Sequence, residues 1–172
     1  ARLGCALTSK VCDYSIAEMA ALCDAFYIGG TKNGLILGEA LVVINKTLNS
    51  DIRYAIKCHG GMYAKGFVNG IMFNELFSNN LFFEIAKNEN KLAEKLYNEL
   101  SKLGVQFLFK QETNQIFPIF DNSLISELEK EISFEVWSSN EDSTTIRFVT
   151  SFLTSDEDVN KVIHLIKNIK QN

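Results

Sequence analysis

The segment Phe26–Gly34, FYIGGTKNG, decides the fold of this chain. It begins as an apolar strand, reaches two glycines, and ends in Asn33-Gly34, a dipeptide typical of turns. Lys32 lies between these glycines. A β-branched apolar run at 41–44 predicts a second strand. The sequence therefore places Lys32 in a glycine-rich loop between two strands, each of which reads as buried on both faces.

A lysine in such a loop has two interpretations. The first is a solvated turn residue, because lysine is rarely buried without a partner. The second is a Schiff-base lysine, which needs freedom to reach a carbonyl carbon and room for a flat ring, and flanking glycines supply both. A phosphate-binding P-loop is excluded, because Thr31 precedes Lys32 and a glycine follows Asn33. Thr31 could still donate a hydrogen bond to a phosphate.

Composition predicts a soluble globular protein. The 172 residues are 47% hydrophobic and 22% charged, and the net charge is 17 − 21 = −4 without a basic run. These values argue against nucleic acid as a partner. The longest apolar run, 35–44, is too short for a membrane span and is interrupted by Glu39. We therefore expect no membrane association.

The cysteines and histidines indicate a reducing compartment and no metal centre. Four cysteines show no Cys-x-x-Cys spacing, and only two histidines are present. The N-terminus lacks the long apolar core of a signal peptide. We therefore expect a cytoplasmic protein with reduced thiols.

The order of elements predicts two domains of an α/β protein. Ser15 and Glu18 form a capping-box pair that predicts a short helix to about Cys23. A long amphipathic helix follows at 81–103 and ends at Gly104. The pattern changes near residue 78, so we expect a domain at 1–78 and a small α+β domain at 79–172. The other predicted elements are a helix at 62–77, strands at 105–109, 116–120, 134–137 and 144–149, and helices at 124–132 and 156–169, the last capped by Ser155 and Asp158.

Several segments resemble the pyridoxal-phosphate-dependent threonine aldolases, a branch of the fold type I enzymes that includes the β-eliminating lyases. Asp24–Val42, DAFYIGGTKNGLILGEALV, resembles the cofactor-lysine segment of that family. Ala1–Gly4 resembles the end of its Asp-Gly-Ala-Arg-Leu-Gly motif, Gly60–Gly66 resembles its glycine-rich turn, and Ile146–Ser151 resembles its C-terminal arginine strand. The resemblance covers essentially the whole chain in the family's order.

The resemblance implies roles for five residues. Lys32 would bind pyridoxal 5'-phosphate covalently, and Thr31 would contribute to the cofactor pocket. Arg147 would hold the substrate α-carboxylate, and Arg2 would lie beside the cofactor and the same carboxylate. Lys65 lies in a turn that in related enzymes is near a subunit interface and can reach a neighbouring active site. Without the resemblance, Arg147 would be interpreted as a solvent-facing strand residue, and Arg2 and Lys65 as surface charges.

The implied activity is cleavage of threonine or a related β-hydroxy-α-amino acid to glycine and an aldehyde, in a homo-oligomeric enzyme, a dimer or a tetramer. The implied fold is the C-terminal part of a fold type I large domain, carrying the cofactor lysine, followed by the small domain. The family's aspartate that pairs with the cofactor ring does not occur before Arg2 in this sequence. We therefore expect this chain to be a C-terminal portion that is inactive without an N-terminal half.

Two alternatives stay open at this point. Another fold type I enzyme, an aminotransferase or a β-eliminating lyase, would use the same lysine and arginine. A non-catalytic truncated chain that completes a partner is the second alternative.

Overall fold

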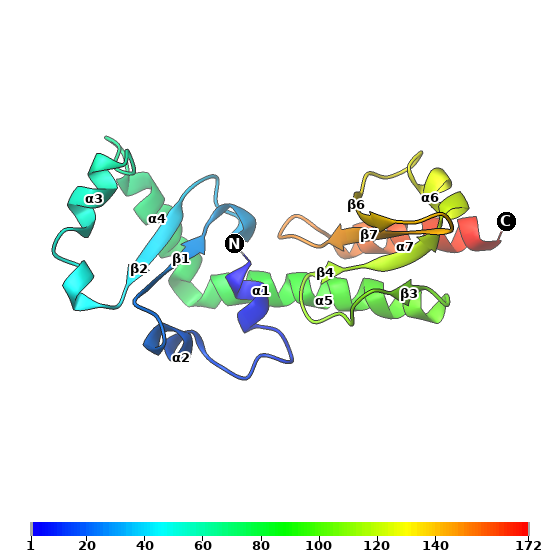
Figure 1. Ribbon diagram of the computed structural model, residues 1–172, viewed down its shortest axis with the longest axis horizontal. Helices are drawn as coiled ribbons and strands as arrows, with labels where there is room; N and C mark the ends of the chain where they lie inside the picture. Colours follow the sequence, from blue (N-terminus) through cyan, green and yellow to red (C-terminus); the bar gives the residue numbers. More distant parts are fainter. Residues whose placement is uncertain (1, 172) are drawn as a thin grey trace. The chain divides into compact units, whose positions relative to one another are not determined.

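The computed structural model describes residues 2–171, so Ala1 of the Ala1–Gly4 segment lies outside the described residues. The chain forms two compact units, 1–85 and 86–172, and each is described by itself (Figure 1). The boundary falls inside helix α5 (Leu81–Lys102). The domain boundary predicted near residue 78 lies just before this helix and stays a prediction.

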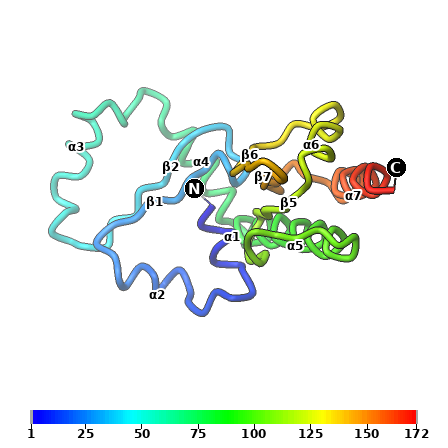
Figure 2. Tube along the Cα trace, turned by 45° about the vertical axis from the view of Figure 1, so that its right-hand side comes forward, coloured from blue at the N-terminus to red at the C-terminus, as the bar shows by residue number. Residues whose placement is uncertain are grey.

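The first unit is built from short helices around a two-stranded sheet. Strands β1 (Ala25–Gly29) and β2 (Glu39–Val43) lie side by side and pair antiparallel, with Ile28 opposite Ala40 (Figures 1 and 2). The strand predictions are thereby confirmed, with β2 starting two residues earlier. The remaining elements are α1 (Leu3–Leu7), α2 (Ile16–Ala21), η1 (Thr31–Asn33), η2 (Lys46–Leu48), α3 (Ile52–Cys58), α4 (Phe67–Phe77), η3 (Ser78–Asn80) and the start of α5.

Burial of this sheet differs from the sequence-based expectation. Ile28 is buried, but the side chains of Tyr27 and Leu41 are 61% and 48% exposed. Within residues 2–171, β1 and β2 pair only with each other, so no further strand of the described part covers their edges. The two strands are thus partly exposed within the described residues, because strands of this apolar composition need neighbouring strands and covering helices that this part of the chain does not supply in full.

The core of the first unit lies between β1, α4 and the first turn of α5. Its buried members are Ile28, Leu76 and Phe82, and Phe82 makes an edge-to-face contact with Phe83, with ring centroids 5.2 Å apart. Side chains from α1, α2 and β2 pack around them. This core fixes the end of β1 against α4, which is where the Lys32 loop begins.

Helix predictions in this unit are confirmed except at one start. Ser15 caps α2, accepting from the Glu18 N–H at 3.2 Å while the Glu18 carboxylate accepts from the Ser15 N–H at 2.7 Å. The helix predicted from residue 62 instead begins at Phe67. Residues 64–66 form a turn, closed by a bond from the Gly66 N–H to the Tyr63 carbonyl at 3.1 Å. Glycine weakens helix formation, so the helix starts only after Gly66.

The second unit is an antiparallel sheet packed against helices. The strand order is β3-β5-β7-β4, and β6 pairs with β7. The prediction of a strand over 116–120 is confirmed in two pieces, because Pro118 has no N–H to donate and interrupts the strand. The elements are β3 (Gln106–Phe107), β4 (Gln115–Ile116), β5 (Pro118–Asp121), α6 (Asn122–Leu128), β6 (Glu135–Ser139), β7 (Ser143–Val149) and α7 (Asp156–Gln171).

Helices α5 and α7 run side by side in the same direction (Figures 1 and 2). Lys95 Nζ lies 2.6 Å from Asp156 Oδ1 at the start of α7, and Lys170 Nζ donates to the Leu103 carbonyl at 2.9 Å near its end. Leu100, Ile146 and Ile166 are fully buried between the helices and the sheet. No helix within residues 2–171 is both long and apolar enough to cross a bilayer.

The predicted cap of α7 is confirmed. The Ser155 hydroxyl accepts from the Asp158 N–H at 3.1 Å, and the Asp158 carboxylate accepts from the Ser155 N–H and hydroxyl at 2.9 and 2.6 Å. The hydrogen bond from the Ser155 hydroxyl, followed by that from its N–H, lowers the pKa of the Asp158 carboxyl below its usual value. The cap therefore stabilises the fold above the ordinary aspartate pKa and loses this contribution as pH falls through the lowered pKa.

Ser155→Ala is expected to lower the thermal unfolding midpoint by about 2–4 °C at pH 7, because one side-chain cap is lost. The difference from the parent should shrink as pH falls through the lowered pKa of Asp158. Calorimetry at several pH values measures both effects. Ser126→Ala is the matched control, since its hydroxyl only donates to the Asn122 carbonyl of its own helix. Equal shifts for both variants would contradict the capping role.

Candidate active site

Asn33 holds the Lys32 turn in place from its buried side. The Asn33 side chain is buried and donates Nδ2 to the Gly29 carbonyl at 2.6 Å. The Asn33 N–H also donates to the Gly30 carbonyl at 2.9 Å. Gly34 has φ +93°, the left-handed conformation that favours glycine. The fold thereby turns Asn33 inward and leaves Thr31 and Lys32 exposed.

Helix α4 packs directly behind this turn. The Gly30 N–H donates to the Gly38 carbonyl at 3.0 Å, which joins the two ends of the loop. A Cβ atom on Gly30 would lie 2.7 Å from that carbonyl oxygen and 3.1 Å from the Phe73 ring. Gly38 has φ +103°, and a Cβ there would lie 2.7 Å from Asn69 Nδ2. Both positions therefore require glycine.

Gly30→Ala is expected to destabilise the protein by about 2 kcal/mol, because the new methyl group meets backbone rather than a flexible side-chain end. Gly70→Ala is the matched control. A Cβ on Gly70, within α4, meets nothing within 4 Å, so this variant should be about 0.5–1 kcal/mol more stable. Denaturant unfolding of both variants measures the contrast, and a stable Gly30→Ala would show that the turn is looser than described.

The amine of Lys32 has no partner in the described part of the chain. No hydrogen bond or ion pair within residues 2–171 engages its Nζ, and the same holds for the Thr31 hydroxyl. The turn thus presents a free amine beside a free hydroxyl on a backbone that is fixed by Asn33 and by packed glycines. An amine that must bond to a carbonyl carbon needs this combination of freedom and support.

Arg2 is the residue that immediately precedes α1 in the first unit. It is half-buried and lines an open hollow of about 620 Å³ together with residues of α1, α2 and β1, among them Tyr27. Lys32 is not among the lining residues.

Arg147 lies on β7 between two other strands of the second unit. Its Nη1 donates to Gln115 Oε1 on β4 at 3.1 Å, and its Nη2 forms an ion pair with Glu135 Oε2 on β6. The Arg147 side chain is 23% exposed, and its buried Nε has no hydrogen-bond partner within residues 2–171. Arg147 is thus a half-buried cation held at both sides, with donor capacity left.

The remaining predicted residues occupy surface turns. Lys65 is exposed in the turn before α4, and its carbonyl accepts from the Val68 N–H at 3.1 Å. His59 is the C-cap residue of α3 and is exposed. Among the residues described, no group of three or more His, Cys, Asp or Glu is placed to hold a metal ion.

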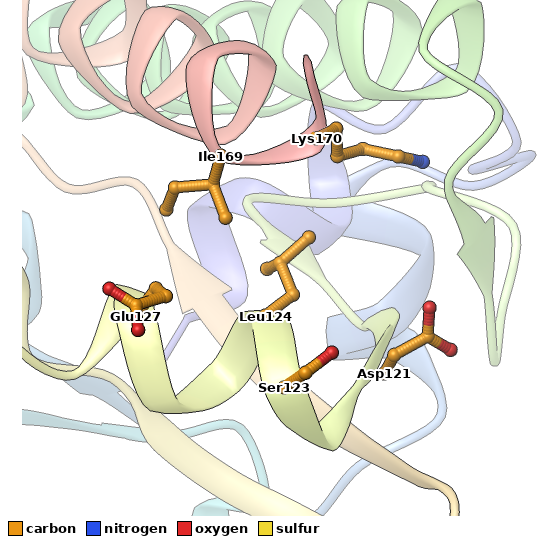
Figure 3. A pocket seen from close by; sticks show the side chains of 6 residues that line it. All are labelled: Asp121, Ser123, Leu124, Glu127, Ile169 and Lys170. Carbon is orange, nitrogen blue, oxygen red and sulfur yellow. The ribbon is translucent and has the colours of Figure 1, made fainter. Parts of the chain in front are cut away.

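A separate cavity of about 440 Å³ lies between α6 and α7 in the second unit (Figure 3). Leu124 and Ile169 point toward each other across it, and Glu127 and Asp121 lie at its two ends (Figure 3). The Lys170 ammonium is bound to the Leu103 carbonyl at the end of α5. This cavity contains none of the predicted site residues.

Sequence reasoning missed three residues that contact or position Lys32 and Arg147 within their own units. Asn33 was visible only as half of a turn dipeptide, and nothing in the sequence showed that its side chain points inward. Gln115 and Glu135 reach Arg147 only through strand pairing, since Glu135 lies directly opposite Arg147 and Gln115 opposite Val149. The alternation of Arg147 with apolar residues was the one signal in the sequence that its side chain shares a sheet face with polar side chains of neighbouring strands.

Comparisons with known proteins agree with these observations. The structure of a threonine aldolase from Leishmania major aligns with a TM-score of 0.93 and 36% identity, covering 98% of this chain and 50% of that one. Low specificity L-threonine aldolases from a Pseudomonas species and from Pseudomonas aeruginosa are 30% and 28% identical over 95 residues, which are 55% of this chain and 28% of each relative. No family model matches the chain.

A more distant likeness concerns the fold alone. Serine palmitoyltransferase from Sphingomonas wittichii aligns with a TM-score of 0.63 at 14% identity and covers 90% of this chain. The chain spans about half the length of the solved threonine aldolase that it matches. Its sequence and structure show that it is a homologue of the threonine aldolases, with the fold of a C-terminal portion of the fold type I enzymes.

Proposed function

We propose that the protein carrying this chain is a pyridoxal-phosphate-dependent aldolase that cleaves threonine or related β-hydroxy-α-amino acids to glycine and an aldehyde. The observation that carries this proposal is the free, exposed amine of Lys32 on a turn whose glycines are packed against α4. The likeness to the Leishmania major threonine aldolase, at 36% identity over 98% of the chain, supports it.

The residues of the turn fit pyridoxal phosphate. Lys32 supplies an amine that no side chain of the described part occupies, and Thr31 supplies a hydroxyl that can donate to a phosphate oxygen. When bound, the cofactor draws electrons away from a bond at the substrate α-carbon. Lys32 holds it covalently, and the braced backbone fixes the point from which the amine extends.

Arg147 binds the substrate α-carboxylate in this proposal. A guanidinium offers paired N–H donors that match two carboxylate oxygens, so it fixes the orientation of the amino acid as well as binding it. Gln115 and Glu135 hold the Arg147 side chain on the sheet face. Arg2 is proposed to assist with the same carboxylate. Orientation matters because the position of the carboxylate would determine which bond at the α-carbon is presented to the cofactor.

We further propose that residues 1–78 form part of a large domain that carries the cofactor lysine, and that residues 79–172 form the small domain. The enzyme is proposed to be a cytoplasmic homo-oligomer, a dimer or a tetramer, in which Lys65 contacts a neighbouring subunit. The exposed turn that precedes α4 supports this placement of Lys65. Sedimentation of the full-length protein tests it, and a monomer would exclude it.

Incubation with pyridoxal phosphate and reduction with borohydride tests the cofactor proposal. Mass spectrometry should locate a single reduced pyridoxyl group on Lys32 in the full-length protein. Labelling scattered over many lysines, or none, would contradict the proposal.

Product analysis tests the reaction. The full-length protein should convert threonine to glycine and acetaldehyde in equal amounts. A keto acid without glycine would instead assign an aminotransferase or a β-eliminating lyase.

A further inference from the structure

The proposed carboxylate-binding arginine already has a carboxylate beside it. Glu135 on β6 lies directly opposite Arg147 on β7, and its Oε2 forms an ion pair with Arg147 Nη2. Gln115 accepts from Nη1 on the other side at 3.1 Å. Three strands thus bring an acid, an arginine and an amide together on one sheet face.

The two partners of Arg147 do not use all its donors. A guanidinium has five N–H groups, and a carboxylate binds best to two of them at once. In Arg147, Nη1 donates one hydrogen bond to Gln115 and Nη2 donates one to Glu135, while Nε has no partner within residues 2–171. A carboxylate that accepted hydrogen bonds from two Arg147 N–H groups at once would make a more complete contact than Gln115 and Glu135 make now.

Glu135 is the more exposed partner of the pair. Its side chain is 55% exposed, against 23% for Arg147. Moving the Glu135 carboxylate into water therefore costs little, since ion pairs with an exposed partner contribute little to stability. Arg147 stays in place because Gln115 and the neighbouring strands hold it.

We propose that Glu135 is an internal carboxylate that occupies Arg147 in the free protein and gives way to the α-carboxylate of an incoming amino acid. This inference rests on the proposed role of Arg147 in substrate binding. Glu135 thereby lowers the apparent affinity for the ligand, because only the fraction of molecules in which Arg147 is released binds it.

The test is a titration of the full-length holoenzyme with glycine. Calorimetry and the absorbance of the bound cofactor measure the binding. Glu135→Gln removes the charge and keeps the shape, so the dissociation constant for glycine should fall by about threefold to tenfold. The KM for threonine should fall by a similar factor. Glu127→Gln is the matched control, because Glu127 pairs with Lys130 on the surface of the same unit, and it should leave both constants unchanged.

An unchanged or weaker affinity of Glu135→Gln for glycine would overturn the inference, and the weaker affinity would make Glu135 a positioning residue for Arg147. If the glutamine variant does not fold, Glu135→Ala carries the same expectation. Arg147→Gln separates the two proposals. If this variant binds glycine as the parent does, the carboxylate role of Arg147 itself fails. If it binds weakly while Glu135→Gln shows no tightening, only the role of Glu135 fails.

Discussion

Lys32→Ala is expected to abolish covalent attachment of pyridoxal phosphate and to lower kcat for threonine cleavage by at least about 10³-fold. The reason is chemical, since alanine offers no amine and no other lysine occupies the glycine turn. The fold should survive, because the Lys32 side chain is exposed and makes no contact that stabilises the first unit. Absorbance of the cofactor, borohydride labelling and steady-state kinetics measure the loss.

Lys46→Ala is the control for this variant. Lys46 is also exposed and also lies in a short 3-10 turn of the first unit, at the end of β2. It should retain the parent's cofactor content and rate. If Lys32→Ala kept a stoichiometric covalent cofactor, the assignment of the FYIGGTKNG segment would be wrong.

Arg147→Gln is expected to lower kcat/KM for threonine by about 10²-fold or more, because the charged donors that face the α-carboxylate are lost. Arg147→Lys should recover only part of this loss, since a single ammonium keeps the charge but cannot bind two oxygens in a planar fork. The glutamine variant also leaves Glu135 without its cation. Circular dichroism should therefore accompany the kinetics, to show that the sheet is intact.

Arg53→Gln is the control for the arginine variants. Arg53 is exposed on α3, and no hydrogen bond or ion pair within residues 2–171 involves its side chain. Its kcat/KM should match that of the parent. Equal activity of Arg147→Gln and Arg53→Gln would remove Arg147 from the substrate site.

Local signals predicted much of this fold. The capping pairs Ser15-Glu18 and Ser155-Asp158 each start a helix, because the bonds that form them lie within four residues. Gly104, with φ +76°, ends α5 as expected for a left-handed C-cap. The turn around Lys32 was also predictable, since glycines and an Asn-Gly pair are typical of turns.

Features that depend on distant residues were not predictable. The inward side chain of Asn33 depends on the Gly29 carbonyl, and the partners of Arg147 depend on which strands pair with β7. The apolar composition of β1 and β2 shows which surfaces favour contact. It does not show whether a covering element lies within the same stretch of chain.

The packing of Gly30 and Gly38 behind the Lys32 turn has a kinetic consequence. With the Gly30 N–H bonded to the Gly38 carbonyl and α4 in contact with both glycines, the backbone of the turn has little room to shift. The amine of Lys32 can then approach and leave its target only by rotation about its own four side-chain bonds. Such rotations in exposed side chains take picoseconds to nanoseconds. If Lys32 acts as proposed, rotation of its side chain is therefore expected to be far faster than turnover and not to limit its rate.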